Sequence, residues 1–401
     1  MANRSTRTGV GALFAAGSTL SMGIAAGGVL TLVFSLLVTR YFGAREYSTL
    51  APLLSFGAIA GVASAGVQNA IMFDIVTHNS FRVVVRHLRS LGVASLVVVA
   101  LGPFVAGYLR VSLVSAFAAL TFAAVTLVSC VPVAMLLARR RILSLSLFNF
   151  LQALLRVAVL IPLRHGSPVT VTFAASLGAV LVGGFGMLGV ALKSVPVSGE
   201  ATPVVSPVQF GQYALGSVLF LPVSIPTWLA RHFLDPTQAG VFSLAVLLAS
   251  TIVMFAGPVT SVVTPRVRAG ERGHLLRQGA WLTGVFAVVS GLGLLAAAPL
   301  VLPSLESTPL PGLRGYLIPL CVGAILWSLA LYGTWIDVAA RGRALGFTVA
   351  TVVGLGAQLL FAWIAPSSFS LAWGPALSGL LYGLLVLFEH YRHSSLGPSA
   401  G

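Results

Sequence analysis

Charged residues are scarce in this sequence. Of its 401 residues, 8% are charged and 57% are hydrophobic, and the mean hydropathy is +1.00. A soluble domain usually carries roughly a quarter charged residues, so this chain cannot cover a water-facing surface. Lipid favours such a composition, because helices satisfy their own backbone polar groups while apolar side chains face the hydrocarbon. The composition predicts an all-α, polytopic integral membrane protein.

Groupings typical of catalysis or metal binding are also missing. The two cysteines, Cys130 and Cys321, lie in apolar runs without metal-ligand spacing, which predicts packing residues. The sequence has no Ser/His/Asp set, no metal-spaced His/Cys cluster and no phosphate-cradling GxxxxGK[ST] loop. The loops between apolar runs are short, whereas membrane glycosyltransferases usually need a long external loop. We therefore expect no enzyme, no cofactor, no metal and no ATP-driven pump in this chain.

The net charge of +15 does not indicate a nucleic-acid partner. The 23 basic residues are scattered between apolar runs and form no patch with interleaved aromatic residues. Basic residues at the ends of apolar runs are instead typical of cytoplasmic loops.

Apolar runs of about 20 residues, long enough to cross a bilayer, occur twelve times. Six lie in the first half, at 16–38, 49–73, 91–109, 111–138, 142–164 and 169–192. Six lie in the second half, at 210–230, 240–264, 279–302, 315–338, 344–365 and 370–388. Only Arg110 separates the third run from the fourth. With the N-terminus inside, 16 basic residues fall on the cytoplasmic side and six outside, which predicts cytoplasmic termini.

The segment 193–209 is rich in proline and has no apolar periodicity, so it reads as a linker. It divides the chain into two predicted six-helix bundles, 1–192 and 210–401. A shift of 192 residues overlays Gly43 on Asp235 at the first turn of each half. Six-span duplications are common among secondary transporters, whose substrate pathway lies between the halves.

Two short motifs follow the first span of each half. The first reads Arg40, Tyr41, Phe42, Gly43, Ala44, Arg45, Glu46, Tyr47, and the second runs from Leu234 through Asp235, Pro236 and Gly240 to Phe242. They resemble the oligosaccharide flippases of the multidrug/oligosaccharidyl-lipid/polysaccharide exporter superfamily, as does the exit Thr264, Pro265, Arg266. Ser48 departs from the pattern, which usually has glycine there.

The resemblance implies a V-shaped pair of six-helix bundles that work by alternating access. It also implies a lipid-linked oligosaccharide as substrate and a place in the bacterial cytoplasmic membrane. The expected partners are this substrate, membrane lipids and other polysaccharide assembly proteins.

One face of the fifth span is polar. Ser146, Asn149, Gln152 and Arg156 are spaced three, three and four residues apart, which places them on one side of a helix. One interpretation is a substrate-binding stripe in which Arg156 grips a diphosphate while Asn149 and Gln152 bond sugar hydroxyls or phosphate oxygens. The alternative is a stripe that holds the span to a neighbouring helix, with Arg156 paired to a carboxylate or to carbonyls.

Two acids lie near span ends. Asp74 lies one helical turn before His78, and Asp337 lies four residues before Arg341, so each has a candidate structural partner. The functional alternative for both is ion coupling or gating of transport.

The sign of the buried charge discriminates between substrates. Residues 16–38 contain no acid, and the only charge deep within a predicted span is Arg156. This favours an anionic, lipid-linked oligosaccharide as the flipped substrate. The alternatives are a cation-coupled multidrug exporter of the same superfamily and a non-transport scaffold of a polysaccharide machine.

Overall fold

The computed structural model describes residues 5–78, 81–139, 141–192, 221–253, 273–305, 312–341 and 345–395, together with positions 259 and 263. All regular structure within these ranges is helical. The chain divides into two compact units, Met1–Ser217 and Val218–Gly401. The predicted linker 193–209 lies outside the described residues.

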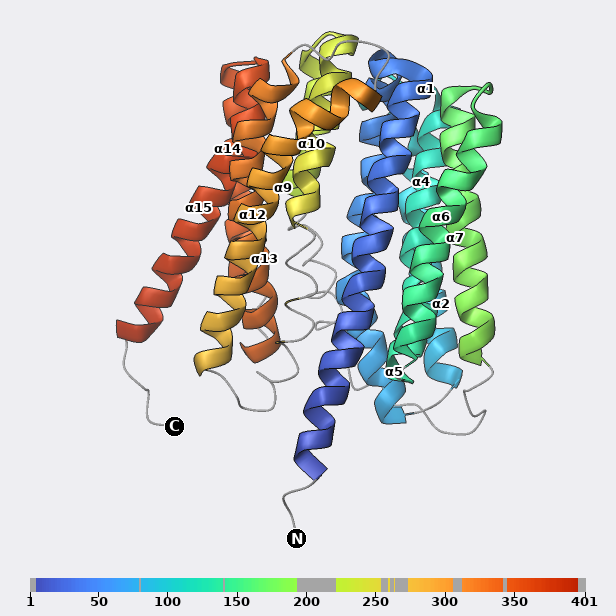
Figure 1. Cartoon of the computed structure of the whole chain (residues 1–401), viewed down its shortest axis with the longest axis vertical. Helices are drawn as coiled ribbons and strands as arrows, with labels where there is room; N and C mark the ends of the chain where they lie inside the picture. The colour runs from blue at the N-terminus through green and yellow to red at the C-terminus, as the bar shows by residue number, and fades with distance from the viewer. Residues whose placement is uncertain are drawn as a thin grey trace. The chain divides into compact units, whose positions relative to one another are not determined.

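The helices of the first unit coincide with the first six predicted spans (Figure 1). The first two spans both lie in α1 (Ser5–His78), and α2 (Phe81–Ala100) with α3 (Gly102–Leu109) forms the third. The fourth consists of α4 (Leu113–Val128) and α5 (Cys130–Ala138). The fifth and sixth are α6 (Ile142–Leu163) and α7 (Pro168–Leu192).

Helix α1 folds back on itself at Gly43, the glycine of the first motif. This residue has φ 82° and ψ 164°, a conformation that is open essentially only to glycine. The side chains of Ser35 and Tyr47 are hydrogen-bonded to each other. Twelve residues of straight helix would separate them by about 18 Å, so the bond requires a reversal between them. We call residues 5–42 the first arm of α1 and residues 44–78 the second arm.

The third and fourth spans separate at Arg110, as the sequence predicted. Helix α3 ends at Leu109, and Arg110 takes the left-handed conformation with φ 53°. Helix α4 then begins after Ser112, whose hydroxyl accepts a hydrogen bond from the Ser115 amide at 3.1 Å. A side-chain cap of this kind satisfies an N–H that the first turn of a helix leaves free.

The second unit contains α9 (Leu221–Phe233), α10 (Pro236–Val253), α12 (Gly273–Leu305), α13 (Leu313–Arg341), α14 (Leu345–Ile364) and α15 (Ser368–Ser395). These helices coincide with the last six predicted spans wherever the residues are described. The second motif starts α10: the Asp235 carboxylate accepts hydrogen bonds from the amides of Thr237 (2.9 Å) and Gln238 (3.2 Å), with Pro236 at the first helical position.

Among the described residues, nine helical segments are long and apolar enough to cross a membrane, and Val349–Ile364 is a shorter apolar helix. One of these segments, Ala26–Gly61, contains the turn at Gly43 and parts of both arms of α1. The chain is therefore a polytopic all-α membrane protein.

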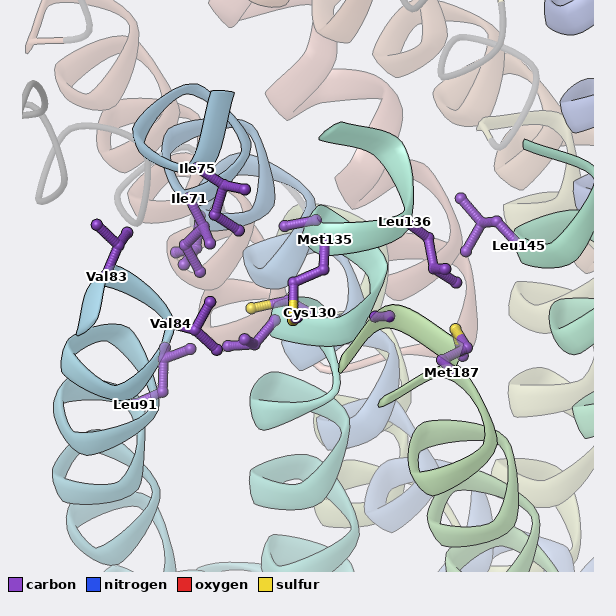
Figure 2. Close-up of a cluster of buried hydrophobic side chains, with 14 residues drawn as sticks. Ile71, Ile75, Val83, Val84, Leu91, Cys130, Met135, Leu136, Leu145 and Met187 are labelled. Carbon is purple, nitrogen blue, oxygen red and sulfur yellow. The ribbon is translucent and has the colours of Figure 1, made fainter. Parts of the chain in front are cut away.

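A buried apolar cluster packs five helices of the first unit together (Figure 2). Ile71 and Ile75 of α1 meet Val83 and Val84 of α2, and α5, α6 and α7 contribute Cys130, Met135, Leu136, Leu145 and Met187. Cys130 is a buried free thiol in this cluster, as expected of a packing residue.

Candidate functional site

The guanidinium of Arg156 lies between helices in the interior of the first unit. Its central carbon is 5.5 Å from the centroid of the Phe34 ring on the first arm of α1. It is also 5.5 Å from the centroid of the Phe122 ring on α4. Both rings are buried. A cation over an aromatic face is attracted by the negative potential of the ring, so the two rings stabilise Arg156 without neutralising its charge.

Among the described residues, Arg156 has none of the polar partners that a structural role would supply. Its Nε atom is buried and has no hydrogen-bond partner among the described residues. No carboxylate among the described residues forms an ion pair with Arg156. A buried donor without an acceptor costs about 1–3 kcal/mol, and such a donor calls for an explanation. The residue as a whole is only partly buried, so some of it remains accessible.

A glycine makes room for one of the two rings. A Cβ atom on Gly57, in the second arm of α1, would lie 2.0 Å from Cε1 of Phe122. The ring of Phe122 therefore occupies the space that any larger residue at position 57 would need. Phe122 also packs edge to face against the ring of Phe173 on α7, with 6.2 Å between the ring centroids.

Two other residues of the predicted stripe, Ser146 and Gln152, also have side chains covered by the first unit. Ser146 is buried, and the Gln152 side chain packs on Gly183 of α7, where a Cβ atom would lie 3.3 Å from that of Gln152. At Asn149 the backbone of α6 passes close to Gly27 of α1. The opposite face of α6 is exposed and apolar, with exposed fractions of 41–73% for Leu143, Leu147, Leu151 and Leu154.

The structure adds polar groups that the sequence analysis missed. In the first arm of α1 the hydroxyls of Thr31, Ser35 and Thr39 each donate to the carbonyl four residues earlier, at 2.9–3.1 Å. The hydroxyls of Thr172 and Ser176 on α7 are buried without a hydrogen-bond partner among the described residues. In both helices these hydroxyl residues are spaced four apart within an apolar span, and that spacing could have identified them from the sequence. Phe34 and Phe122 had no such signal, because a ring in an apolar run is unremarkable.

Asp74 is buried on α1, next to Ile75 of the apolar cluster. Its carboxylate lies 2.9 Å from Nε2 of His87, which is also buried, on α2. The side chain of His78, the partner predicted for Asp74, lies outside the described residues. The side chains of Asp337 and Arg341 also lie outside them, although both positions belong to α13. Among the described residues, no group of three His, Cys, Asp or Glu residues is placed to hold a metal ion.

Comparison with known proteins identifies the fold. No protein-family model matches the chain, and no curated protein sequence matches it significantly. Solved structures do match: the lipid II flippase MurJ, in an inward closed conformation, has a TM-score of 0.71 at 12% sequence identity, over 93% of this chain and 87% of that one. The MATE multidrug transporter DinF-BH matches with a TM-score of 0.64 at 13% identity, over 94% and 95% of the two chains.

A multidrug resistance MATE family transporter of the MOP superfamily, in an inward-facing conformation, matches at 17% identity with a TM-score of 0.61. This match covers 96% of each of the two chains. The fold of this superfamily, which the two turn motifs predicted, is therefore confirmed for this chain.

Proposed function

We propose that this protein is a membrane transporter that flips a lipid-linked oligosaccharide with an anionic diphosphate head across the bacterial cytoplasmic membrane. The observation that carries the proposal is Arg156, a cation inside the first unit without a carboxylate partner among the described residues. Ionisable groups at membrane depth are costly and mark substrate or ion pathways. An uncompensated positive charge favours an anionic substrate by Coulombic complementarity.

The neighbouring residues support this assignment. The guanidinium offers a planar set of donors that matches phosphate oxygens, and Gln152 and Asn149 lie one and two turns away on the same helix face. In this proposal Arg156 binds the diphosphate, Gln152, Asn149 and Ser146 contact sugar or phosphate oxygens, and the lipid tail stays in the bilayer. The two units would alternate access, with both termini in the cytoplasm as the arginine distribution favours.

A second candidate is a cation-coupled multidrug exporter of the same fold. The buried Asp74, paired with His87, is the observation that favours it, because exporters of organic cations need membrane-embedded carboxylates. Against it, positions 26–42 in the first arm of α1 contain no acidic residue. Asp74 and Asp337 are the residues that would couple or gate transport in either candidate.

The test is lipid mass spectrometry of cells that lack this protein. We expect polyprenyl diphosphate-linked oligosaccharide to accumulate, the wild-type chain to clear it, and Arg156→Ala to leave it in place. The matched control is Arg164→Ala, which removes the same charge beyond the end of the same helix, where Arg164 also lies over a ring (Tyr41, 5.9 Å). This control should clear the lipid as the wild type does.

Two results would reject the proposal. If the deletion changes no lipid but makes cells sensitive to cationic dyes, the exporter candidate replaces it. If both arginine variants clear the lipid equally well, Arg156 is not the head-group ligand. Immunoblotting of membranes would verify that each variant is present at the wild-type amount.

A further inference from the structure

The two rings beside Arg156 come from helices far apart in the sequence. Phe34 lies on the first arm of α1 and Phe122 on α4, yet each ring centroid is 5.5 Å from the same guanidinium carbon. A guanidinium held over aromatic rings keeps its N–H donors at its planar edge. Because Nε has no acceptor among the described residues, that edge holds at least one buried donor for a ligand to satisfy.

We propose that Phe34 and Phe122 are positioning residues, which hold the Arg156 guanidinium in one orientation so that its edge donors meet the oxygens of the diphosphate. This inference rests on the proposed function of Arg156 as the head-group ligand. A long, unrestrained arginine side chain loses rotamer freedom when it binds. A side chain already ordered by two rings has lost much of that freedom beforehand, so a ligand binds more tightly.

A substitution at Gly57 can displace the Phe122 ring while Phe122 and Arg156 themselves stay unchanged. Adding a methyl group at position 57 would place a carbon 2.0 Å from Cε1 and 2.7 Å from Cδ1 of Phe122, so the ring must move. Gly61, one helical turn further along the same arm, has nothing within 4 Å of its own added carbon. Gly57→Ala and Gly61→Ala therefore make the same chemical change in the same helix, and only the first displaces the ring.

The experiment measures binding of farnesyl diphosphate, a short prenyl diphosphate, to the purified full chain in detergent by isothermal titration calorimetry. We expect Phe122→Leu, Phe34→Leu and Gly57→Ala to weaken binding by roughly three- to ten-fold, the size expected from ordering one long side chain. Gly61→Ala should bind as the wild type does. Arg156→Ala should bind weakly, through the tail alone.

A double variant separates positioning from packing. If Phe122 acts through Arg156, adding Phe122→Leu to Arg156→Ala causes no further loss of affinity. A further loss as large as in the wild-type background would assign Phe122 a packing role and overturn the inference.

The remaining outcomes are also distinct. Loss with Arg156→Ala but wild-type affinity in all three ring variants overturns the inference and leaves the proposed function standing. Wild-type affinity in Arg156→Ala overturns both, because the rings then have no ligand group to position.

Discussion

The two units of this chain differ in the charge of the polar groups inside them. Among the described residues, the buried polar groups of the second unit are neutral, and Ser243 Oγ and Gln358 Oε1 have no hydrogen-bond partner. Others are hydrogen-bonded: the Trp327 indole donates to the Pro375 carbonyl at 3.0 Å, and the Thr334 and Tyr382 hydroxyls are bonded to each other. Ser328 donates to the Ala324 carbonyl at 2.8 Å. The first unit contains ionisable groups: the buried Asp74–His87 pair and the partly buried Arg156, whose buried Nε atom has no hydrogen-bond partner among the described residues.

This difference distinguishes a packing interior, whose polar groups stabilise the fold, from an interior that contains charged groups for function. Neutral hydrogen bonds between helices satisfy their own donors and fix one arrangement, so they need no ligand. A cation with a buried, unpaired donor destabilises the unit that contains it, and natural proteins retain such groups mainly where function requires them. Among the described side chains, the second unit has no buried charge. We therefore expect substitutions in the second interior to lower stability and substitutions at Arg156 to lower transport.

The largest effect on stability should come from Trp327→Ala. Trp327 is completely buried, it packs against Tyr382 at a ring-centroid distance of 5.2 Å, and Gly379 lies close against it. Losing this volume and the indole hydrogen bond should lower the free energy of unfolding by about 3–5 kcal/mol. Thermal unfolding of the purified protein in detergent would measure this. Trp281→Ala is the control, because Trp281 is 67% exposed on α12 and should change the melting temperature little.

An intermediate loss of stability is expected at the turn after the first span of each unit. The shift of 192 residues aligns these two turns, but one has a glycine and the other a helix cap. Gly43→Ala places a side chain at φ 82° and ψ 164°, which should cost about 1–3 kcal/mol. Asp235→Ala removes the two hydrogen bonds that cap α10, at a cost of about 1 kcal/mol.

The same melting experiment would compare the two turn variants. No other atom lies within 4 Å of an added Cβ at Gly43, so any loss there reflects backbone strain. Equal melting temperatures for Gly43→Ala and the wild type would show that α1 turns without needing a glycine.

The sequence predicted the helices well because lipid imposes a strong pattern on composition. Apolar runs located the spans to within a few residues at most ends of the described helices, and Arg110, the one residue between the third and fourth runs, lies between α3 and α4. Gly43 belongs to the motif that the sequence analysis placed where the first span turns into the second. These features are local, so a stretch of sequence contains all the information needed to recognise them.

The surroundings of Arg156 were not predictable in the same way. The charge itself was conspicuous in an apolar span, and its face of α6 followed from helical periodicity. Its ring neighbours, Phe34 and Phe122, lie 122 and 34 positions before it in the sequence. Helical periodicity relates residues of one helix and cannot show which residues of other helices lie beside them. The sequence suggested a carboxylate or carbonyls as structural partners of Arg156 and gave no indication of the two rings that lie beside its guanidinium. His87, thirteen residues beyond Asp74, was missed for the same reason.

The smallest effect on stability should come from Arg156→Leu, and it sharpens the comparison most. Leucine removes a buried, unpaired donor and fills part of the same space with apolar atoms, so we expect the free energy of unfolding to change by less than about 1 kcal/mol. Transport should nevertheless be lost, measured as uncleared lipid-linked oligosaccharide in cells. A melting temperature that falls as far as in Trp327→Ala would instead mean that the rings and Arg156 hold the first unit together. In that case the first interior is a packing interior like the second, and Arg156 is retained for stability.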